Sequence, residues 1–337
     1  MKKNSYSVRG GFLRNAKRAL LTLAISSAAL PASADVFQQI IDNVVARELS
    51  TSNVTSLVAS AKAYISNMKD DGSWPDVNYA SNAQTNWPAM THLNRLKTLA
   101  VAYVSPGSAL KGDEKLYAQI VSGLNYWYAK KPVSTNWWYW EIGWPQEMGV
   151  ILCLMRSGEK QLPESTEKNI LAWQKSISKG PNQSGSQGSG ANKMDIALQW
   201  IYRTALQKDK SNLDFAVNQF FLPVKFNTGE GLQSDYSYLQ HGMQLYAGGY
   251  GGSVLTATIK VAYYLVGTSY AEQGDYLDYI SGFVRYGYLP SVRGQYMSFN
   301  NVGRSVALPN GMLRSSFSTI TTAMTDLDRA HAEEFNA

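Results

Sequence analysis

Sustained helical periodicity is the feature that most constrains the fold of this chain. Apolar residues recur at three- and four-residue spacing through most of the sequence, as at Leu93, Leu96, Ala100 and Tyr103. Such spacing places the apolar side chains on one face of a helix. Strand-like alternation is nowhere sustained. We predict about ten helices joined by short polar breaks, that is, an all-α chain of antiparallel hairpins arranged as a solenoid or a closed toroid.

The first 34 residues have the pattern of a cleavable export signal. Six basic residues and no acidic ones precede the apolar run "ALLTLAISSAAL", and "ASA" at 32–34 is a small-residue cleavage site. Neither this run nor any later stretch reaches the roughly 20 apolar residues that a membrane-spanning helix needs. We therefore predict a signal peptide over 1–34, a mature chain over 35–337 that is secreted or periplasmic, and no membrane association.

Removal of that segment changes the charge balance. The whole chain has 31 basic and 25 acidic residues, and without the six basic residues of the signal it has 25 of each. A neutral mature chain has no general attraction for polyanions, so the high isoelectric point reflects targeting and gives no support for nucleic-acid binding.

Several catalytic classes lack their usual motifs. The sequence contains no G-x-S-x-G, no Walker A lysine and no H-E-x-x-H, and three histidines with one cysteine are too few for a zinc site. We expect no metal and no cofactor. Cys153, the only cysteine, cannot form an intramolecular disulfide, and its apolar surroundings "GVILCLM" predict the core of a helix.

An aromatic cluster occupies "NWWYWEIGWPQEMG" at 136–149. Its four consecutive aromatic residues, 137–140, cannot all lie on one buried face of a helix or a strand. At least one ring is expected to face solvent or a groove, where it could stack on a sugar. A half-exposed apolar seam between helices is the alternative.

Two further clusters and one loop carry the remaining polar candidates. The stretch "QSDYSYLQHGMQLYAGGYGG" at 233–252 joins His241 to Tyr250 through glycines that allow a ligand to approach closely, although a lone histidine is usually structural. The segment "FNNVGRSVALPNG" at 299–311 presents Arg304 from a loop. The Gly- and Ser-rich loop 179–191 leads into Asn192 and is either a surface insertion or a flexible lip over a groove.

A tyrosine, a histidine, an arginine and an asparagine without a carboxylate pair suit β-elimination on a uronic acid. An asparagine amide can bind the uronate carboxylate and so make the C5 proton more acidic. A tyrosine phenolate, favoured by a nearby arginine and histidine, can take that proton and return it to the leaving oxygen. A glycosidase would instead need two carboxylates that flank the scissile bond.

Four segments, in this order and at these spacings, resemble polysaccharide lyase family 8: "NWWYWEIGWPQEMG", "GANKMDIAL", "EGLQSDYSYLQHGMQL" with its following "GGYG", and "RGQYMSFNNVGR". That family contains chondroitin AC, hyaluronate and xanthan lyases, and the chain is most similar to the first of these. The resemblance covers essentially all of 35–337. It implies an incomplete α/α toroid with the substrate in a long groove across it.

The resemblance also implies roles for individual residues. The family's catalytic positions match Asn192, His241, Tyr250 and Arg304, and its substrate-binding aromatic patch matches Asn136, Trp137 and Trp138. By this match, Asn192 engages the uronate carboxylate, His241 lies beside C5 and Tyr250 acts as base and acid. Arg304 is expected to form hydrogen bonds near the tyrosine.

The implied partner is an acidic polysaccharide such as chondroitin or hyaluronan, bound by a monomer. Leu308 departs from chondroitin AC lyases, which have a second arginine at this position. The chain is also expected to lack the family's C-terminal β-sandwich domains. Two alternatives to a lyase therefore stay open, namely a truncated sugar-binding toroid domain with impaired or no catalysis and an α/α-toroid glycoside hydrolase.

Overall fold

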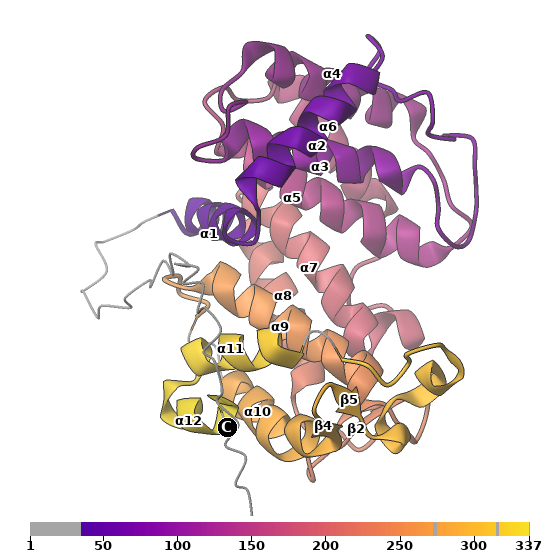
Figure 1. Cartoon of the computed structure of the whole chain (residues 1–337), viewed down its shortest axis with the longest axis vertical. Helices are drawn as coiled ribbons and strands as arrows, with labels where there is room; N and C mark the ends of the chain where they lie inside the picture. Colours follow the sequence, from indigo (N-terminus) through magenta and orange to yellow (C-terminus); the bar gives the residue numbers. More distant parts are fainter. Residues whose placement is uncertain (1–34, 272–274, 315–316, 337) are drawn as a thin grey trace, which may run out of the picture. The chain divides into compact units, whose positions relative to one another are not determined.

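Helices build most of the chain (Figure 1). The computed structural model describes residues 35–271, 275–314 and 317–336, and the predicted signal peptide over 1–34 lies outside them. The α-helices of the described residues are α1 (Val36–Ser50), α2 (Val54–Asn67), α3 (Met90–Val104), α4 (Glu114–Lys130), α5 (Trp144–Arg156), α6 (Glu164–Ile177), α7 (Gly190–Gln207), α8 (Lys210–Phe221), α9 (Gly252–Leu265), α10 (Tyr276–Gly282), α11 (Phe317–Leu327) and α12 (Ala332–Asn336).

Successive helices pack as hairpins. Within the unit formed by the described residues, α3 packs on α4 and α7 on α8, while α3, α5, α7 and α9 follow one another as neighbours. α1 closes this row by packing against α5, α7 and α9. The predicted all-α architecture of helical hairpins is confirmed.

Side-chain caps explain where several of these helices begin. Asp113 accepts a hydrogen bond from the Leu116 amide at 2.7 Å at the start of α4, and Asn53 accepts one from the Ser56 amide at 3.2 Å at the start of α2. Each satisfies a backbone donor that has no partner inside the helix. At its other end, α4 stops at Lys131, whose φ of 44° is left-handed.

A row of tryptophans forms the core behind the aromatic segment. Trp144 of α5 stacks on Trp173 of α6 with ring centroids 4.4 Å apart, and it lies 6.2 Å from Trp127 of α4. Truncating one of these buried rings to alanine should cost about 3–5 kcal/mol. The row fixes the first turn of α5, and Cys153 lies fully buried further along that helix, as predicted.

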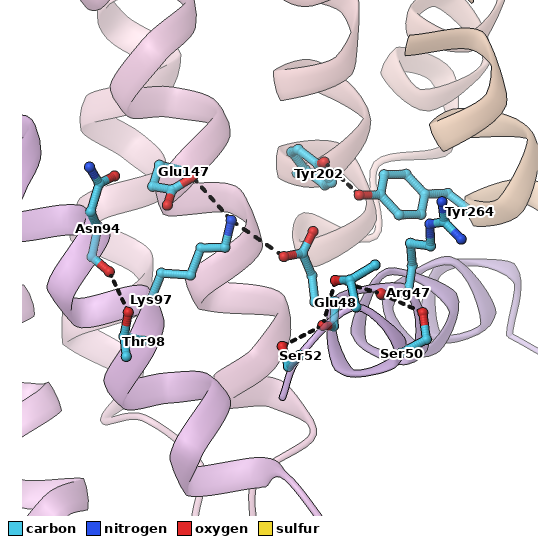
Figure 2. Close-up of polar contacts among 11 residues, drawn as sticks. Arg47, Glu48, Ser50, Ser52, Asn94, Lys97, Thr98, Glu147, Tyr202 and Tyr264 are labelled. Carbon is cyan, nitrogen blue, oxygen red and sulfur yellow. Dashed lines mark hydrogen bonds and ion pairs between the residues drawn. The ribbon is translucent and has the colours of Figure 1, made fainter. Parts of the chain in front are cut away.

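Polar contacts between helices complete this core. Lys97 Nζ of α3 lies 3.3 Å from Glu48 of α1 and 3.5 Å from Glu147 of α5 (Figure 2). Burial raises the pKa of Glu147, although Lys97 opposes this effect. Between α7 and α9, the Tyr202 hydroxyl donates to the Tyr264 hydroxyl at 3.2 Å. The first set of contacts links α1, α3 and α5, and the second links α7 to α9.

Short strands and π-helical turns interrupt the helices near the predicted site residues. The strands are β1 (Gly231–Leu232), β2 (Tyr238–Gln240) and β3 (Gln244–Leu245), which form an antiparallel sheet in that order, and β4 (Val292–Arg293) paired with β5 (Tyr296–Met297). The π-helical turns are η1 (Tyr139–Gly143), η4 (Ala247–Gly251) and η5 (Phe283–Tyr288). Among the described residues, no helix is both long enough and apolar enough to cross a membrane.

Candidate active site

The aromatic segment lies immediately before η1 and α5. The Asn136 side chain donates to the Gln84 carbonyl at 2.8 Å and accepts from the Trp138 amide at 3.0 Å. Trp138 is 40% exposed, and its ring lies so close to Gly143 that a Cβ there would be 2.8 Å from it. The expectation that at least one ring faces solvent is confirmed. Trp138 is therefore available to stack on a sugar.

The remaining rings of the segment turn toward the core. Tyr139 lies 5.5 Å from Trp87, and Trp140 lies 6.2 Å from Trp173, both measured between ring centroids. Trp137 is half-buried. The segment is thus both a seam between helices and a source of one exposed ring, and the stacking of that ring on a sugar stays a prediction.

His241 occupies the turn between β2 and β3. Its φ is 56° and that of Gly242 is 82°, both in the left-handed region, and for a residue with a Cβ this costs about 1 kcal/mol. The Gln240 side chain donates to Glu230 Oε2 at 2.6 Å, and the Gly242 amide donates to Glu230 Oε1 at 2.7 Å. One carboxylate therefore binds both residues that flank His241. The histidine itself is exposed.

Tyr250 stands on the π-helical turn η4, at the start of α9. Its ring centroid lies 5.1 Å from that of His241 and 5.2 Å from that of Tyr246, in both cases edge to face. Tyr246 is buried, and a Cβ on Gly303 would be 2.5 Å from its ring. The φ of Gly303 is 53°, so both space and backbone require glycine there. Turns of the π type are frequent at functional sites.

Arg304 follows that glycine in the 3₁₀ helix η8 (Gly303–Ala307). η8 and the preceding η7 (Phe299–Asn301) both contact η4, the turn that bears Tyr250. The Arg304 side chain is exposed, and within the described residues it makes no hydrogen bond or ion pair. Its guanidinium is therefore available to a ligand.

Asn192 lies in the first turn of α7. Its Nδ2 donates to the Ser186 carbonyl at 3.0 Å, within the short 3₁₀ helix η2 (Ser186–Gly188). Two residues earlier, a Cβ on Gly190 would be 2.9 Å from Gln240 Oε1, so the start of α7 lies against the residue that precedes His241. The asparagine thus approaches the histidine turn from a separate helix.

The loop 179–191 joins the aromatic segment to Asn192. Gln183 of this loop donates to Glu141 Oε2 of η1 at 3.0 Å, and Lys193 of α7 donates to the Pro181 carbonyl at 2.8 Å. The loop is therefore bound to η1 on one side and to α7 on the other. It connects the predicted substrate-binding patch with the predicted catalytic residues.

The predicted site residues come together to different degrees. His241 and Tyr250 are in direct contact. Arg304 reaches the same cluster through Gly303, and Asn192 reaches it through Gly190 and Gln240. The aromatic patch at 136–138 lies next to η1, which contacts α7 directly and also through Gln183 of the loop.

A cavity of ≈ 470 Å³ is lined by Gly248 and Gly249 of η4 and, among others, by Gln146, Asp195, Lys260 and Arg314. Burial raises the pKa of Asp195 to about 6, and the Gln146 side chain donates to its carboxylate at 3.3 Å. Burial lowers the pKa of Lys260. Neither His241 nor Tyr250 lines this cavity, so it is distinct from the residues that the sequence singled out.

Sequence reasoning missed several of these residues. Asp195 could have been found, because it follows Asn192 by three residues and so shares its helical face. Tyr246 lies inside the stretch 233–252 but gave no signal that distinguished it from the other tyrosines. Glu230 is the first residue of the segment "EGLQSDYSYLQHG". Its contact with the turn at 241–242 depends on the β1–β2–β3 pairing, which has no periodic pattern in the sequence.

The comparison that decides the family is a match to a family model. The model described as polysaccharide lyase family 8, N terminal alpha-helical domain, matches residues 38–337. The chain belongs to polysaccharide lyase family 8. It is similar to Chondroitinase-AC of Pedobacter heparinus, with 40% identity over 276 residues that cover 82% of this chain and 39% of the relative. It is also similar to hyaluronate lyase HylB of Enterococcus faecalis, with 29% identity over 62% of this chain and 24% of the relative.

Solved structures of family 8 lyases superpose on this chain. A chondroitinase AC lyase, studied through enzyme–oligosaccharide complexes and mutagenesis, superposes with a TM-score of 0.82 and 37% identity over 89% of this chain and 44% of that one. The Streptomyces coelicolor A3 chondroitin AC lyase in complex with chondroitin sulphate has a TM-score of 0.76 and 20% identity, over 90% of this chain and 44% of that one. The second likeness concerns the fold alone.

These likenesses confirm the predicted fold class, the incomplete toroid of helical hairpins found in the α-helical domain of family 8. The chain spans about two-fifths of the length of Chondroitinase-AC. The roles of Asn136, Trp137, Trp138 and the four catalytic candidates stay predictions.

Proposed function

We propose that this chain is the α-helical domain of a secreted polysaccharide lyase that cleaves chondroitin- or hyaluronan-type chains by β-elimination. Its similarity to Chondroitinase-AC over 82% of its residues supports the substrate class. The observation that carries the chemistry is the direct contact between His241 and Tyr250 beside an available Arg304. The reaction yields a 4,5-unsaturated uronate and a new reducing end.

The C5 proton of a uronic acid is a weak acid as long as the neighbouring carboxylate keeps its full negative charge. A donor that binds this carboxylate stabilises the charge that develops when the proton leaves. Asn192 supplies such a donor, because its amide stands at the start of α7 and the Ser186 carbonyl fixes its orientation. The positive end of the α7 helix dipole adds to this effect.

Tyr250 then exchanges the proton. Its phenolate takes the proton from C5, the C5–H electron pair becomes the C4=C5 double bond, and the bond from C4 to the glycosidic oxygen breaks. The phenol returns the proton to that oxygen as it leaves, so the tyrosine ends unchanged. Arg304, from the neighbouring η8, can stabilise the negative charge that develops on the sugar, and His241 lies where it can contact the same sugar ring.

Trp138 and Arg304 provide the chemistry expected of an acidic polysaccharide site. An exposed tryptophan ring can stack on the apolar face of a sugar, and an exposed guanidinium can pair with its carboxylate or sulfate. The neutral mature chain makes local groups of this kind necessary for binding a polyanion.

The glycoside hydrolase alternative receives less support. An inverting or retaining glycosidase needs two carboxylates that face the scissile bond from opposite sides. Near His241 and Tyr250, the Glu230 carboxylate is engaged by Gln240 and Gly242. On the cavity side, Asp195 accepts from Gln146.

Product analysis tests this function. The protein is incubated with chondroitin and with hyaluronan, and the near-ultraviolet absorbance and the reducing ends are followed together. A lyase raises both in parallel, since each cut makes one unsaturated uronate. New reducing ends without absorbance would establish a hydrolase. Retained binding with neither signal would establish a sugar-binding module.

Secretion is a separate part of the proposal. It rests on the basic and apolar pattern of residues 1–34 and on the "ASA" at 32–34. N-terminal sequencing of the protein recovered outside the cytosol should begin at Asp35. A protein that stays in the cytosol with an intact Met1 would contradict it.

A further inference from the structure

Glu230 contacts the histidine turn from a different segment of the chain. It precedes β1, and the antiparallel pairing of Gly231 with Leu239 brings it alongside the end of β2. There, its two carboxylate oxygens accept separately, Oε2 from the Gln240 side chain at 2.6 Å and Oε1 from the Gly242 amide at 2.7 Å. Both bonds are short, as expected for a charged acceptor.

The two bonds enclose His241 from either side. Gln240 is 4% exposed, so one bond anchors the carboxylate to a buried side chain. The other bond reaches the backbone at Gly242, immediately after the left-handed His241. A non-glycine residue persists in that conformation only where its surroundings enforce it. Glu230 is the enforcing group that the contacts identify.

We propose that Glu230 is a positioning residue that fixes the 241–242 turn and thereby holds the His241 ring against Tyr250. In this role it acts through Gln240 and Gly242 and not by contact with the substrate. The role in the reaction rests on the proposed lyase function, whereas the hold on the turn does not. A side chain that does not itself react can still affect the rate, because a misplacement of a reacting group by about 1 Å can cost roughly 100-fold in rate.

Substitution of Glu230 tests the role. Glu230→Ala removes both acceptors, and Glu230→Gln keeps one acceptor but points an amide donor at the Gln240 donor. Each variant is expected to lower kcat about 10- to 100-fold with a smaller change in KM. The matched control is Asp235→Asn. Asp235 lies in the same hairpin and accepts from the Ser237 amide at 2.9 Å, but it does not contact the histidine turn.

An exchange of side chains provides the rescue. In the double variant Glu230→Gln with Gln240→Glu, the amide at position 230 donates to the carboxylate at position 240 and still accepts from the Gly242 amide. The double variant should recover most of the kcat that Glu230→Gln loses. Gln240→Glu alone places two carboxylates together and should be as impaired as Glu230→Gln. A structural effect unrelated to this pair would not be reversed by the exchange.

Two measurements without substrate separate this inference from the proposed function. Hydrogen exchange at the Gly242 amide should accelerate in Glu230→Ala and stay unchanged in Asp235→Asn. The imidazole resonances of His241, one of only three histidines, should shift in Glu230→Ala and stay unchanged in Asp235→Asn. An unprotected Gly242 with reduced kcat supports the proposal. Unchanged Gly242 protection in Glu230→Ala, or unchanged kcat in an active enzyme, overturns it. A wild-type protein without lyase activity refutes the proposed function. The hydrogen-exchange data then still test whether Glu230 holds the 241–242 turn.

Discussion

The rings of His241 and Tyr250 meet edge to face, with centroids 5.1 Å apart and an angle of 85° between their planes. The two residues come from a β-turn and a π-helical turn that are nine positions apart in the chain. In this arrangement, the edge of one ring packs on the face of the other, a geometry that aromatic pairs favour. The contact places the tyrosine ring beside an exposed imidazole.

Removal of the Tyr250 hydroxyl should abolish turnover. Tyr250→Phe keeps the ring that packs on His241 and Tyr246 but removes the hydroxyl that we propose exchanges the proton. Oligosaccharide affinity, measured by calorimetry, should stay near that of the wild type while kcat falls below detection. Tyr286→Phe is a suitable control, since its hydroxyl accepts from Arg285 on an exposed surface. A Tyr250→Phe variant with wild-type kcat would remove the tyrosine from the mechanism.

Loss of the Asn192 amide should weaken transition-state stabilisation by about 2–4 kcal/mol, as for loss of one oxyanion donor. The substitution Asn192→Ala also removes a hydrogen bond to the Ser186 carbonyl. Ser189→Ala removes another bond to that same carbonyl, at 3.3 Å, without touching the amide. The account expects a large fall in kcat/KM for the first variant and a small one for the second. Equal losses would assign the effect to the loop.

A positive charge at position 308 should raise the preference for sulfated substrates. Leu308 is 62% exposed at the end of η8, four residues after Arg304. Leu308→Arg adds one charge-assisted hydrogen bond, worth about 1.5–3 kcal/mol in the ratio of kcat/KM for matched sulfated and unsulfated oligosaccharides. Val306→Arg, on the same short helix, controls for added charge alone. No gain from Leu308→Arg, or an equal gain from both variants, would show that position 308 does not read the sulfate.

Asp195 should make the protein less stable as the pH rises. Burial raises its pKa to about 6, above the value of an unfolded chain, so the native state binds this proton more tightly. The corresponding stabilisation is complete below about pH 4 and is lost as the pH rises through about 6. The wild type loses this stabilisation between about pH 4 and neutral pH, whereas Asp195→Asn has no carboxyl group to lose it. Over that interval, the free energy of unfolding of Asp195→Asn should therefore rise by on the order of 2 kcal/mol relative to that of the wild type.

Urea unfolding at several pH values checks this difference. Asp76→Asn is the matched control with the opposite sign, because the hydrogen bond from Arg95 lowers the pKa of Asp76. That variant should lose stability relative to wild type as the pH rises, and only slightly, since the pair is exposed and screened. A parallel pH dependence of wild type and Asp195→Asn would contradict the raised pKa.

The helical architecture could be predicted from the sequence because burial of an apolar stripe is a local pattern. Residues such as Leu93 and Leu96 repeat it along α3, and both are fully buried. The exposure of Trp138 was predictable for a related reason, since four adjacent aromatic residues cannot share one face. The choice between solenoid and toroid was not, because it depends on contacts between distant helices such as α1 and α9.

The detailed site could be predicted only in part. The residue types at 192, 241, 250 and 304 indicated the chemistry, but their approach depends on backbone features with no periodic signal. The π-helical turn at 247–251 and the left-handed His241 are two such features. Glu230 and Asp195 were missed because most carboxylates in a sequence are solvated surface charges. Only the folded structure shows the partners of Glu230 and the cavity beside Asp195.

The mass of the cleavage products tests the central claim most directly. β-Elimination breaks the bond from C4 to oxygen without consuming water, so the two fragments of a defined chondroitin or hyaluronan oligosaccharide together have the mass of the parent. We predict this result for the wild-type protein and no fragments from Tyr250→Phe. Fragments whose summed mass exceeds the parent by one water would contradict the lyase account and establish hydrolysis.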